Sequence, residues 1–280
     1  MKAKKSYPIV LSIAGSDSSG GAGIQADIKT FSSLGVYGAT AITAITAQNT
    51  LGVHSQFAID PQMVYNQIVA VLDDLHPRYV KIGMLANVGI VNAVAEALGR
   101  YDLSVILDPV IVSSSGHRLL SEEAQEAIKQ RLLPLTMLIT PNIPEAEALC
   151  GMRLSTLESK ELAARHLIDL GAGSVLIKGG HEVGDAKIDI LFFMSPNGME
   201  TTIFSSETIK TKNIHGTGCT LSSAIAAFMA RGLSMHDAVA EAKRYVGEAI
   251  CAGADVEIGH GIGPVNHGFN PQKMIINERR

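Results

Sequence analysis

The sequence predicts an α/β fold in which helices cover a mainly parallel central sheet. Short apolar runs alternate along the chain with segments whose apolar residues recur at helical spacing. The runs are apolar nearly throughout, which is typical of parallel strands buried on both faces. Near residue 185 two adjacent strand-like segments predict a small antiparallel edge. Because the 280 residues contain no linker and no internal repeat, residues 1–280 are expected to form one domain.

Six apolar runs are predicted to be strands buried on both faces: 8–15, 39–47, 79–85, 103–110, 136–142 and 174–180. The segments 61–75 and 87–101 are predicted helices that begin with Pro61 and Asn87 near the first turn. The first run, which follows several lysines, also resembles a signal peptide. It is short and interrupted by Ser12, and a glycine-rich turn and a helix follow at once. A buried first strand is therefore the preferred interpretation.

The last third of the chain predicts a hairpin and two helices. Segments 187–194 and 199–209 flank the turn Pro196-Asn197-Gly198, which favours an antiparallel pair at the edge of the sheet. Helices are expected over 217–231 and 235–254. The second of these helices carries one apolar face, formed by Met235, Ala238, Val239, Ala242, Val246, Ala249 and Ile250.

The composition favours a small-molecule partner. The net charge is −4 and charged residues make up 18%, so no basic field indicates nucleic acid. No apolar run approaches the roughly 20 residues that span a bilayer. The three cysteines are widely spaced, without a C-x-x-C pair or a cluster with histidine, which favours a reducing cytoplasm. Cys150 and Cys251 are predicted to be packing residues.

The ends of the predicted strands carry the residues that can bind a ligand, because parallel sheets bind ligands beyond their carboxyl ends. These positions are Gly15 to Gly23, Gln48, Met84, Asp108, Asn142, Glu145 and Lys178 to Gly180. Asp108 and Glu145 could hold Mg²⁺ on ATP phosphates. Asn142 to Glu145 also fits an ordinary helix start with an acidic first turn. Lys178 fits either a surface lysine or a nucleotide contact beside an accessible glycine backbone.

Two glycine motifs near the N-terminus resemble nucleotide-binding loops and fail as such. Gly21 to Ala26 matches G-x-G-x-x-A, but the acidic residue expected about 20 positions further on is missing. Gly15 to Gly20 has the glycine spacing of a P-loop, but Gly21 and Ala22 replace the required Lys and Ser/Thr. This segment is either a plain strand-to-helix turn or a turn that closes over a small substrate.

The segment Gly216-Thr217-Gly218-Cys219 begins an apolar helix and predicts an anion-binding site. Unpaired N–H groups and the positive end of the helix dipole meet there, so a phosphoryl group in transfer would be stabilised. The alternative is an ordinary glycine cap with a buried cysteine. The helix N-terminus is expected to lower the pKa of Cys219, which could then take a proton from a substrate hydroxyl. A nucleophilic cysteine is the competing interpretation, with only His215 nearby.

Several motifs together resemble the hydroxymethylpyrimidine/phosphomethylpyrimidine kinase family of thiamine biosynthesis. They are 14-AGSDSSGGAGIQADIKTF-31, 43-TAITAQNTLGV-53, 81-KIGML-85, 107-LDPV-110, 139-ITPNIPEAEAL-149, 177-IKGGH-181, 211-TKNIHGTGCTLSSA-224 and 259-GHGIGPVNH-267. The match runs almost end to end. The resemblance implies a ribokinase-like three-layer fold and a cytoplasmic homodimer. It also implies that ATP and Mg²⁺ serve to phosphorylate 4-amino-5-hydroxymethyl-2-methylpyrimidine and then its monophosphate. A monovalent cation requirement stays open.

The resemblance also implies roles for individual residues. Cys219 would be the base, and the amides of Gly216, Thr217, Gly218 and Cys219 would hold the moving phosphoryl group. On the pyrimidine side would lie Gln48, reading the aminopyrimidine edge, with Met84 and Ile111 along the ring and Asp27, Gly21 and Ala22 nearby. On the ATP and metal side would lie Asn142, Lys178, Thr211, Lys212, Glu145 and, acting through water, Asp108.

Two positions depart from related sequences. Ser113 stands where a pyridoxal kinase branch has a second cysteine, which favours the pyrimidine substrate. Ser114 replaces a lysine that many members carry, which would weaken the second phosphorylation more than the first. A pyridoxal or pyridoxine kinase on the same fold is the main alternative function. A non-catalytic vitamin- or nucleotide-binding protein is the alternative from another class.

Overall fold

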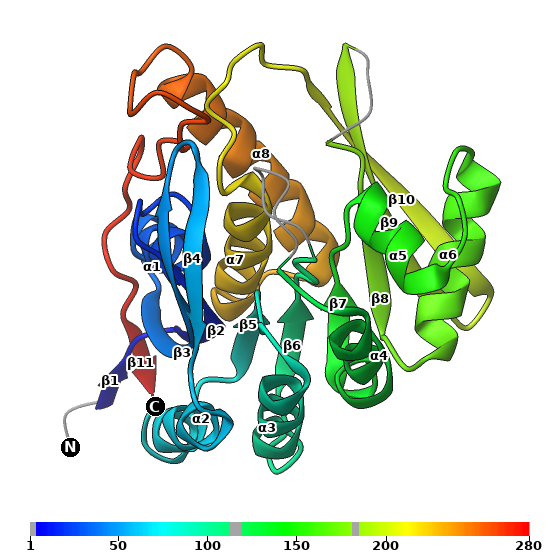
Figure 1. Cartoon of the computed structure of the whole chain (residues 1–280), viewed down its shortest axis with the longest axis horizontal. Coiled ribbons are helices and arrows are strands. Elements are labelled where there is room, and N and C mark those ends of the chain that lie inside the picture. The colour runs from blue at the N-terminus through cyan, green and yellow to red at the C-terminus, as the bar shows by residue number, and fades with distance from the viewer. Residues whose placement is uncertain (1–3, 112–118, 181–184, 280) are drawn as a thin grey trace.

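The computed structural model describes residues 4–111, 119–180 and 185–279. Within these ranges one mixed sheet has the strand order β10-β9-β8-β7-β6-β5-β2-β3-β4 (Figure 1). Its strands are β2 Ile9–Asp17, β3 Tyr37–Asn49, β4 Gly52–Ala58, β5 Tyr79–Ile82, β6 Ser104–Leu107, β7 Thr136–Ile139, β8 Ser174–Lys178, β9 Ala186–Ser195 and β10 Gly198–Glu207. A separate small sheet pairs β1 Lys4–Ser6 with β11 Asn277–Arg279, beside the two termini.

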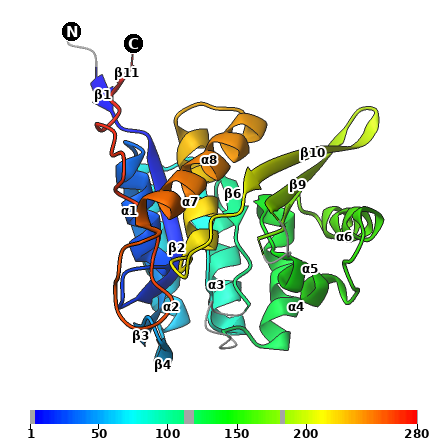
Figure 2. The same cartoon turned by 90° about the horizontal axis from the view of Figure 1, so that it is seen from above.

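Helices cover both faces of the large sheet. They are α1 Gly23–Ser33, α2 Pro61–Leu75, α3 Val88–Leu98, α4 Glu122–Arg131, α5 Ile143–Cys150, α6 Leu157–Asp169, α7 Thr217–Ala230 and α8 Met235–Gly253, with a short 3₁₀ turn at Leu133–Leu135. One core cluster joins the sheet to α2 through α6, and a second joins it to α1, α7 and α8. Figure 2 shows α7 and α8 on one side of the sheet and α2, α3 and α4 on the other. The predicted α/β fold is confirmed.

The strand pairing agrees with a parallel sheet that has antiparallel edges. Strands β3, β2, β5, β6, β7 and β8 pair in parallel, whereas β9 and β10 continue the sheet antiparallel, as predicted. A second antiparallel edge, formed by β4 against β3, was not predicted. The segment of β4 has no apolar run, because most of its side chains face solvent.

The six predicted strands are all present, but one is less buried than expected. In β2, Val10, Leu11 and Ile13 are fully buried, so the N-terminal run is an internal strand. Residues 39–47 lie in β3, where Ile45 is 50% exposed, so burial on both faces is wrong for this strand. The reason is position: β3 is next to the sheet edge, and Ile45 pairs with Phe57 of β4, which is 71% exposed.

The predicted helices begin where their capping residues indicate. Asp60 caps α2 by accepting from the N–H of Met63, and Asn87 caps α3 by accepting from Ile90. The two last helices match α7 and α8. Cys150 packs between α5 and α6, as predicted. Cys251 is exposed, so its assignment as a packing residue is wrong; the packed face of α8 runs through Ala238, Ala242 and Ala249, and Cys251 lies off it.

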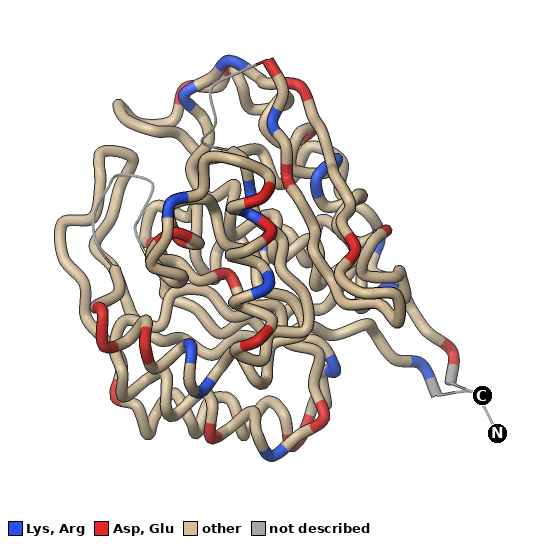
Figure 3. The backbone as a smooth tube through the Cα atoms, turned by 90° about the vertical axis from the view of Figure 1, so that its right-hand side faces the viewer, with Lys and Arg blue, Asp and Glu red and all other residues tan. Residues whose placement is uncertain are grey.

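The next features are the hydrophobicity of the helices and the distribution of charge along the described residues. In the described part of the chain, no helix combines the length and the hydrophobicity that crossing a membrane requires. Figure 3 shows basic and acidic residues interspersed along the whole trace. Several charged residues are instead buried in pairs, and these pairs lie beside the cavity described next.

Candidate active site

A cavity of about 590 Å³ opens at the carboxyl ends of the parallel strands, and the N-terminus of α7 forms part of its wall. This is where ligands bind in sheets of this kind. Most of the predicted site residues line it: Ala22, Gln48, Met84, Asp108, Ile111, Asn142, Glu145, Lys178, Gly216, Thr217, Gly218 and Cys219. Motifs that are far apart along the chain therefore meet at one cavity.

The start of α7 has the geometry of an anion-binding site. Gly216 has φ +82°, and a β-carbon there would overlap the carbonyl oxygen of Gly21, so only glycine fits. Gly216 supplies no side-chain cap to the helix. The N–H of Thr217 donates to the carbonyl of Ile214 at 3.3 Å. The N–H groups of Gly218 and Cys219, together with the positive end of the helix dipole, are therefore the donors for a ligand in the cavity. A β-carbon at Gly218 would lie 3.5 Å from Nζ of Lys178, so a cation adjoins this site.

Lys178 lies between two carboxylates. Its Nζ donates to Oδ1 of Asp108 at 2.7 Å and is 3.9 Å from Oε2 of Glu145. Burial raises the pKa of Glu145 to about 7, with Lys178 opposing this and Asp108 adding to it. Burial acts on Asp108 in the same direction, but Lys178 and Lys81 outweigh it and lower its pKa. The two carboxylates therefore differ: Asp108 stays ionised, whereas the pKa of Glu145 lies near neutrality.

The Asn142–Glu145 segment is a helix start, as the sequence predicted, and it also forms part of the cavity wall. The side chain of Asn142 accepts from the N–H of Glu145 at 2.8 Å, and the N–H of Asn142 donates to Oε2 of Glu145 at 2.8 Å, which is a capping box. The same two residues line the cavity. The helix start therefore fixes the carboxylate of Glu145 against the site.

Asp108 and Glu145 can hold Mg²⁺ only if phosphate and water supply the rest of its ligands. Among the described residues, no group of three or more His, Cys, Asp or Glu side chains could hold a metal ion alone. In phosphate-transfer sites Mg²⁺ takes one or two carboxylates and completes its shell with phosphate oxygens and water. Asp108 and Glu145 match that donor set, and Glu145, whose pKa is raised mainly by burial, keeps only a distant cation, Lys178 at 3.9 Å.

The helix N-terminus was expected to lower the pKa of Cys219, and this prediction is wrong for the protein without bound ligand. Burial raises the pKa of this thiol to about 11, and the charges of Asp27 and Asp108 add to the effect. Lys81 and a hydrogen bond from the N–H of Gly23 lower it, without compensating. A helix N-terminus alone does not produce a thiolate when the sulfur loses its water and faces two carboxylates.

Four predicted residues are not brought to the cavity surface. Asp27 is fully buried and binds Nζ of Lys81 at 2.9 Å; it also accepts from Ser12 and Ser223. Its carboxylate is thus engaged beneath the site. The other three are Gly21, Thr211 and Lys212, none of which lines the cavity. Thr211 instead donates to the carbonyl of Ala254 at 2.7 Å, which ties this segment to the end of α8.

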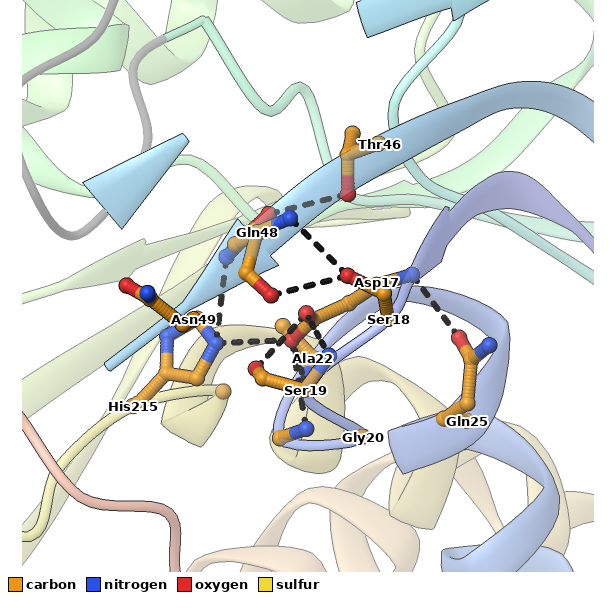
Figure 4. A network of polar contacts seen from close by, with 12 residues as sticks. Asp17, Ser18, Ser19, Gly20, Ala22, Gln25, Thr46, Gln48, Asn49 and His215 are labelled. Atoms are coloured by element: carbon orange, nitrogen blue, oxygen red, sulfur yellow. Dashed lines mark hydrogen bonds and ion pairs between the residues drawn. The ribbon is translucent and has the colours of Figure 1, made fainter. Parts of the chain in front are cut away.

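Sequence reasoning missed two pairs that line the cavity. His215 Nε2 lies 2.8 Å from Oδ2 of Asp17 and 3.3 Å from Nε2 of Gln48 (Figure 4). Asp189 of β9 accepts from Nζ of Lys243 at 2.6 Å and from the N–H of Gly179 at 3.0 Å. Asp17 lies in the predicted segment Gly15 to Gly23 and His215 was named beside Cys219, but their pairing was not predicted. Asp189 could have been found as a charge inside an apolar strand.

A family model and two similar relatives all indicate one kinase family. The family model described as phosphomethylpyrimidine kinase matches residues 17–266. The hydroxymethylpyrimidine/phosphomethylpyrimidine kinase of Escherichia coli is 48% identical over 259 residues, covering 92% of this chain and 96% of that protein. The enzyme of the same name from Bacillus subtilis is 46% identical over 271 residues, covering 96% of this chain and 98% of that protein.

Solved structures give the same relationship. The phosphomethylpyrimidine kinase of Clostridium difficile has a TM-score of 0.75 at 43% identity, covering 86% of this chain and 99% of that one. The pyridoxal kinase of Staphylococcus aureus in complex with AMP-PCP and pyridoxal has a TM-score of 0.84 at 31% identity, covering 98% and 99%. The chain is thus similar to kinases of two small aromatic rings.

Proposed function

The chain belongs to the phosphomethylpyrimidine kinase family, and we propose that it converts 4-amino-5-hydroxymethyl-2-methylpyrimidine to the monophosphate and then to the pyrophosphate, with ATP, in thiamine biosynthesis. It has the ribokinase-like fold and is a phosphotransferase that acts on a small molecule. One observation carries the proposal: the N-terminus of α7, the Lys178–Asp108–Glu145 cluster and Gln48 all line one cavity.

The ring of the substrate is proposed to lie between Gln48, Met84, Ile111 and Ala22. Met84 and Ile111 are buried apolar side chains that both line the cavity. The carboxamide of Gln48 offers one donor group and one acceptor. An aminopyrimidine edge offers the complementary pair, a ring nitrogen beside an amino group, so the fit is chemically specific.

The phosphoryl group is proposed to lie over the first turn of α7. The N–H groups of Gly218 and Cys219 are fixed donors that would stabilise the charge that develops during transfer. The N–H of Thr217 donates to the carbonyl of Ile214 at 3.3 Å and could only be shared with a ligand. Lys178 adds a positive charge beside them. Mg²⁺, when bound by Asp108 and Glu145, would neutralise phosphate charge. Asn142 and Lys178, which line the cavity, are the proposed ATP contacts. Thr211 and Lys212 do not line it and are not part of this proposal.

Cys219 is proposed as the base that accepts the proton of the substrate hydroxyl. It lines the cavity in the same turn as the proposed phosphoryl site. Its pKa of about 11 means that few molecules carry the thiolate at neutral pH, but that thiolate is a strong base. Lys81, which lowers the pKa of Cys219, is the buried cation that favours the reactive form.

We propose that the protein is a one-domain cytoplasmic homodimer. One sheet runs through the described chain, which supports a single domain. All three cysteines are free, which is in keeping with a reducing compartment. Ile45, Leu51 and Phe57 are exposed at the β3–β4 edge, and a second copy could cover them. Light scattering after gel filtration should give twice the mass of the 29.6 kDa chain, and a mass of one chain would contradict the dimer.

The decisive experiment offers the purified protein hydroxymethylpyrimidine, its monophosphate and pyridoxal in parallel, with ATP and Mg²⁺. Product formation is followed by mass. Pyrophosphate from the pyrimidine is expected. Phosphorylation of pyridoxal alone would favour the second candidate, a pyridoxal kinase, for which the likeness to the Staphylococcus aureus enzyme is the specific argument. If no ring gave an ATP-dependent product, the protein would be a non-catalytic vitamin- or nucleotide-binding protein. Ser113 and Ser114, predicted to affect substrate choice and the second step, lie outside the described residues.

A further inference from the structure

Asp17 is the centre of a polar network between the turn that follows β2 and the residue that precedes Gly216. Its carboxylate accepts from the N–H and hydroxyl of Ser19, from the N–H groups of Gly21 and Ala22, and from Nε2 of His215 at 2.8 Å (Figure 4). Burial raises the pKa of Asp17, but His215 and Ser19 outweigh it and bring the value to about 2. The carboxylate is therefore ionised and can only accept hydrogen bonds.

This network determines which nitrogen of His215 carries a proton. Because Oδ2 of Asp17 can only accept, Nε2 of His215 must be protonated, in the neutral and in the charged ring alike. The same Nε2 lies 3.3 Å from Nε2 of Gln48. The one hydrogen on Nε2 goes mainly to Asp17, and a protonated Nε2 has no lone pair, so it cannot accept from Gln48 when the amide nitrogen faces His215. Half a turn about the last bond of Gln48 puts the amide oxygen there instead, where it can share the Nε2 hydrogen with Asp17, with almost no change of shape.

Thr46, on the other side of the carboxamide, favours the same orientation. Its hydroxyl lies 2.9 Å from the carbonyl of Ser16, which can only accept, so its single proton is used there. Oγ1 of Thr46 is also 3.2 Å from Oε1 of Gln48, and it has only lone pairs left for that contact. With the amide turned, the amino group of Gln48 donates to Thr46. Two independent neighbours thus select one amide direction.

Hydrogen bonds also fix the backbone that carries Gln48 and His215. Ser18 Oγ donates to the carbonyl of Gln48 at 2.8 Å and accepts from its N–H at 2.9 Å. Beyond α8, the N–H of Ile262 donates to the carbonyl of Thr50, and the carbonyl of Gly263 accepts from the N–H of His215, both at 2.9 Å. The segment Gly261-Ile262-Gly263 therefore ties the end of β3 to His215. The relative position of Gln48 and His215 is built into the fold.

We propose that His215, oriented by Asp17, is a positioning residue that fixes the direction of the Gln48 carboxamide, with its oxygen toward His215 and its amino group toward Thr46. One lone pair and one amide hydrogen then remain, in a fixed order, to bind the ring. The matching ligand class is a planar heteroaromatic with an acceptor nitrogen beside a primary amino group. Rings that lack this adjacent pair are discriminated against. This inference rests on the proposed function, because it assumes that Gln48 contacts the ring.

The test is a double-mutant cycle read by calorimetric binding and by kinetics. His215→Phe keeps a ring but removes the N–H donor, and Gln48→Leu removes the carboxamide. Hydroxymethylpyrimidine and pyridoxal are the probes. His215→Phe is expected to weaken hydroxymethylpyrimidine binding about tenfold, with KM affected more than kcat and pyridoxal affected less. In the Gln48→Leu background the same change should have almost no further effect. His166→Phe, an exposed histidine on α6, is the matched control and should leave binding unchanged.

Each outcome decides between the two proposals. Additive effects of His215→Phe and Gln48→Leu would overturn the positioning role, even with full wild-type turnover of the pyrimidine. Equal weakening of both rings by His215→Phe would overturn it as well, because it would indicate general damage to the site. If the wild type binds and phosphorylates only pyridoxal, the proposed function fails, while the cycle run with pyridoxal still tests the coupling. Wild-type affinity in Gln48→Leu would overturn the positioning role, because Gln48 would then not contact the ring, while pyrophosphate formation by the wild type would still support the proposed function.

Discussion

At the scale of single residues, the environment of Cys219 decides how the site can work. The thiol lies at a helix N-terminus, which favours the thiolate, yet burial and two nearby carboxylates raise its pKa to about 11. The base is thus strong and seldom available. This balance makes the thiol testable by removal and by pH.

Replacing the thiol should separate binding from turnover. Cys219→Ala is expected to lower kcat about 10² or more, which is the effect of losing a positioned base, and to leave the affinity for the pyrimidine within about twofold. Steady-state kinetics and calorimetry measure the two quantities. Cys251→Ala, at an exposed position, is the control. A kcat within a few-fold of the wild type would exclude the role of base.

The pH profile should have two phases with different causes. Glu145 has a pKa of about 7, so activity is expected to rise as this carboxylate ionises and can hold Mg²⁺. Cys219 has a pKa of about 11, so kcat/KM should keep rising between about pH 8 and 9.5, where the thiolate fraction grows about tenfold per pH unit.

The two phases are separated by comparing the wild type with Cys219→Ala over the same pH range. The variant should retain the rise near pH 7 and lose the alkaline rise. A wild-type profile that is flat above pH 8 would contradict the assignment of the thiolate.

At the scale of elements, the turn before α7 and the turn after β2 form one unit. Gly216 has a positive φ and packs directly on the carbonyl of Gly21, so the anion site exists only while the two turns stay in contact. The hydrogen bond between Asp17 and His215 crosses the same contact. The sequence indicated each turn separately and gave no sign of the contact between them.

Gly216→Ala should therefore cost both stability and activity. The positive φ alone costs about 1–2 kcal/mol for alanine, and the overlap with Gly21 must also be relieved by moving the turn. Gly232→Ala is the matched control, because Gly232 has φ +96° with nothing within 4 Å of a β-carbon. Urea unfolding and kcat are measured for both. The interpretation is wrong if the two variants have equal stability and full activity.

At the scale of the whole molecule, buried ion pairs connect the layers beneath the cavity. Lys81 of β5 and Asp27 of α1 are both fully buried, and Ser223 of α7 donates to Asp27 at 2.6 Å. The pair thus joins the sheet to two helices of one layer. Removing one partner leaves an uncompensated charge in the core, which costs more than removing both.

Lys81→Met should lower the free energy of unfolding by about 3–5 kcal/mol, and Lys81→Met with Asp27→Asn should recover most of the loss, because the double variant buries no lone charge. Asparagine keeps an oxygen that can accept from Ser12 and Ser223. Chemical denaturation followed by circular dichroism measures both variants. A single variant within about 1 kcal/mol of the wild type would show that water reaches this pair.

The sequence by itself determined the α/β class, the six central strands, the helix starts at Pro61 and Asn87, and the motifs that identify the family, because each depends on residues close together in the chain. Only the tertiary structure decided which distant residues meet, such as His215 and Asp17, 198 positions apart. It also decided that Asp27 is buried beneath the cavity, that Ile45 is half exposed near the sheet edge, and that the pKa of Cys219 is raised. Burial and electrostatics depend on neighbours brought together by folding, and no local pattern specifies them.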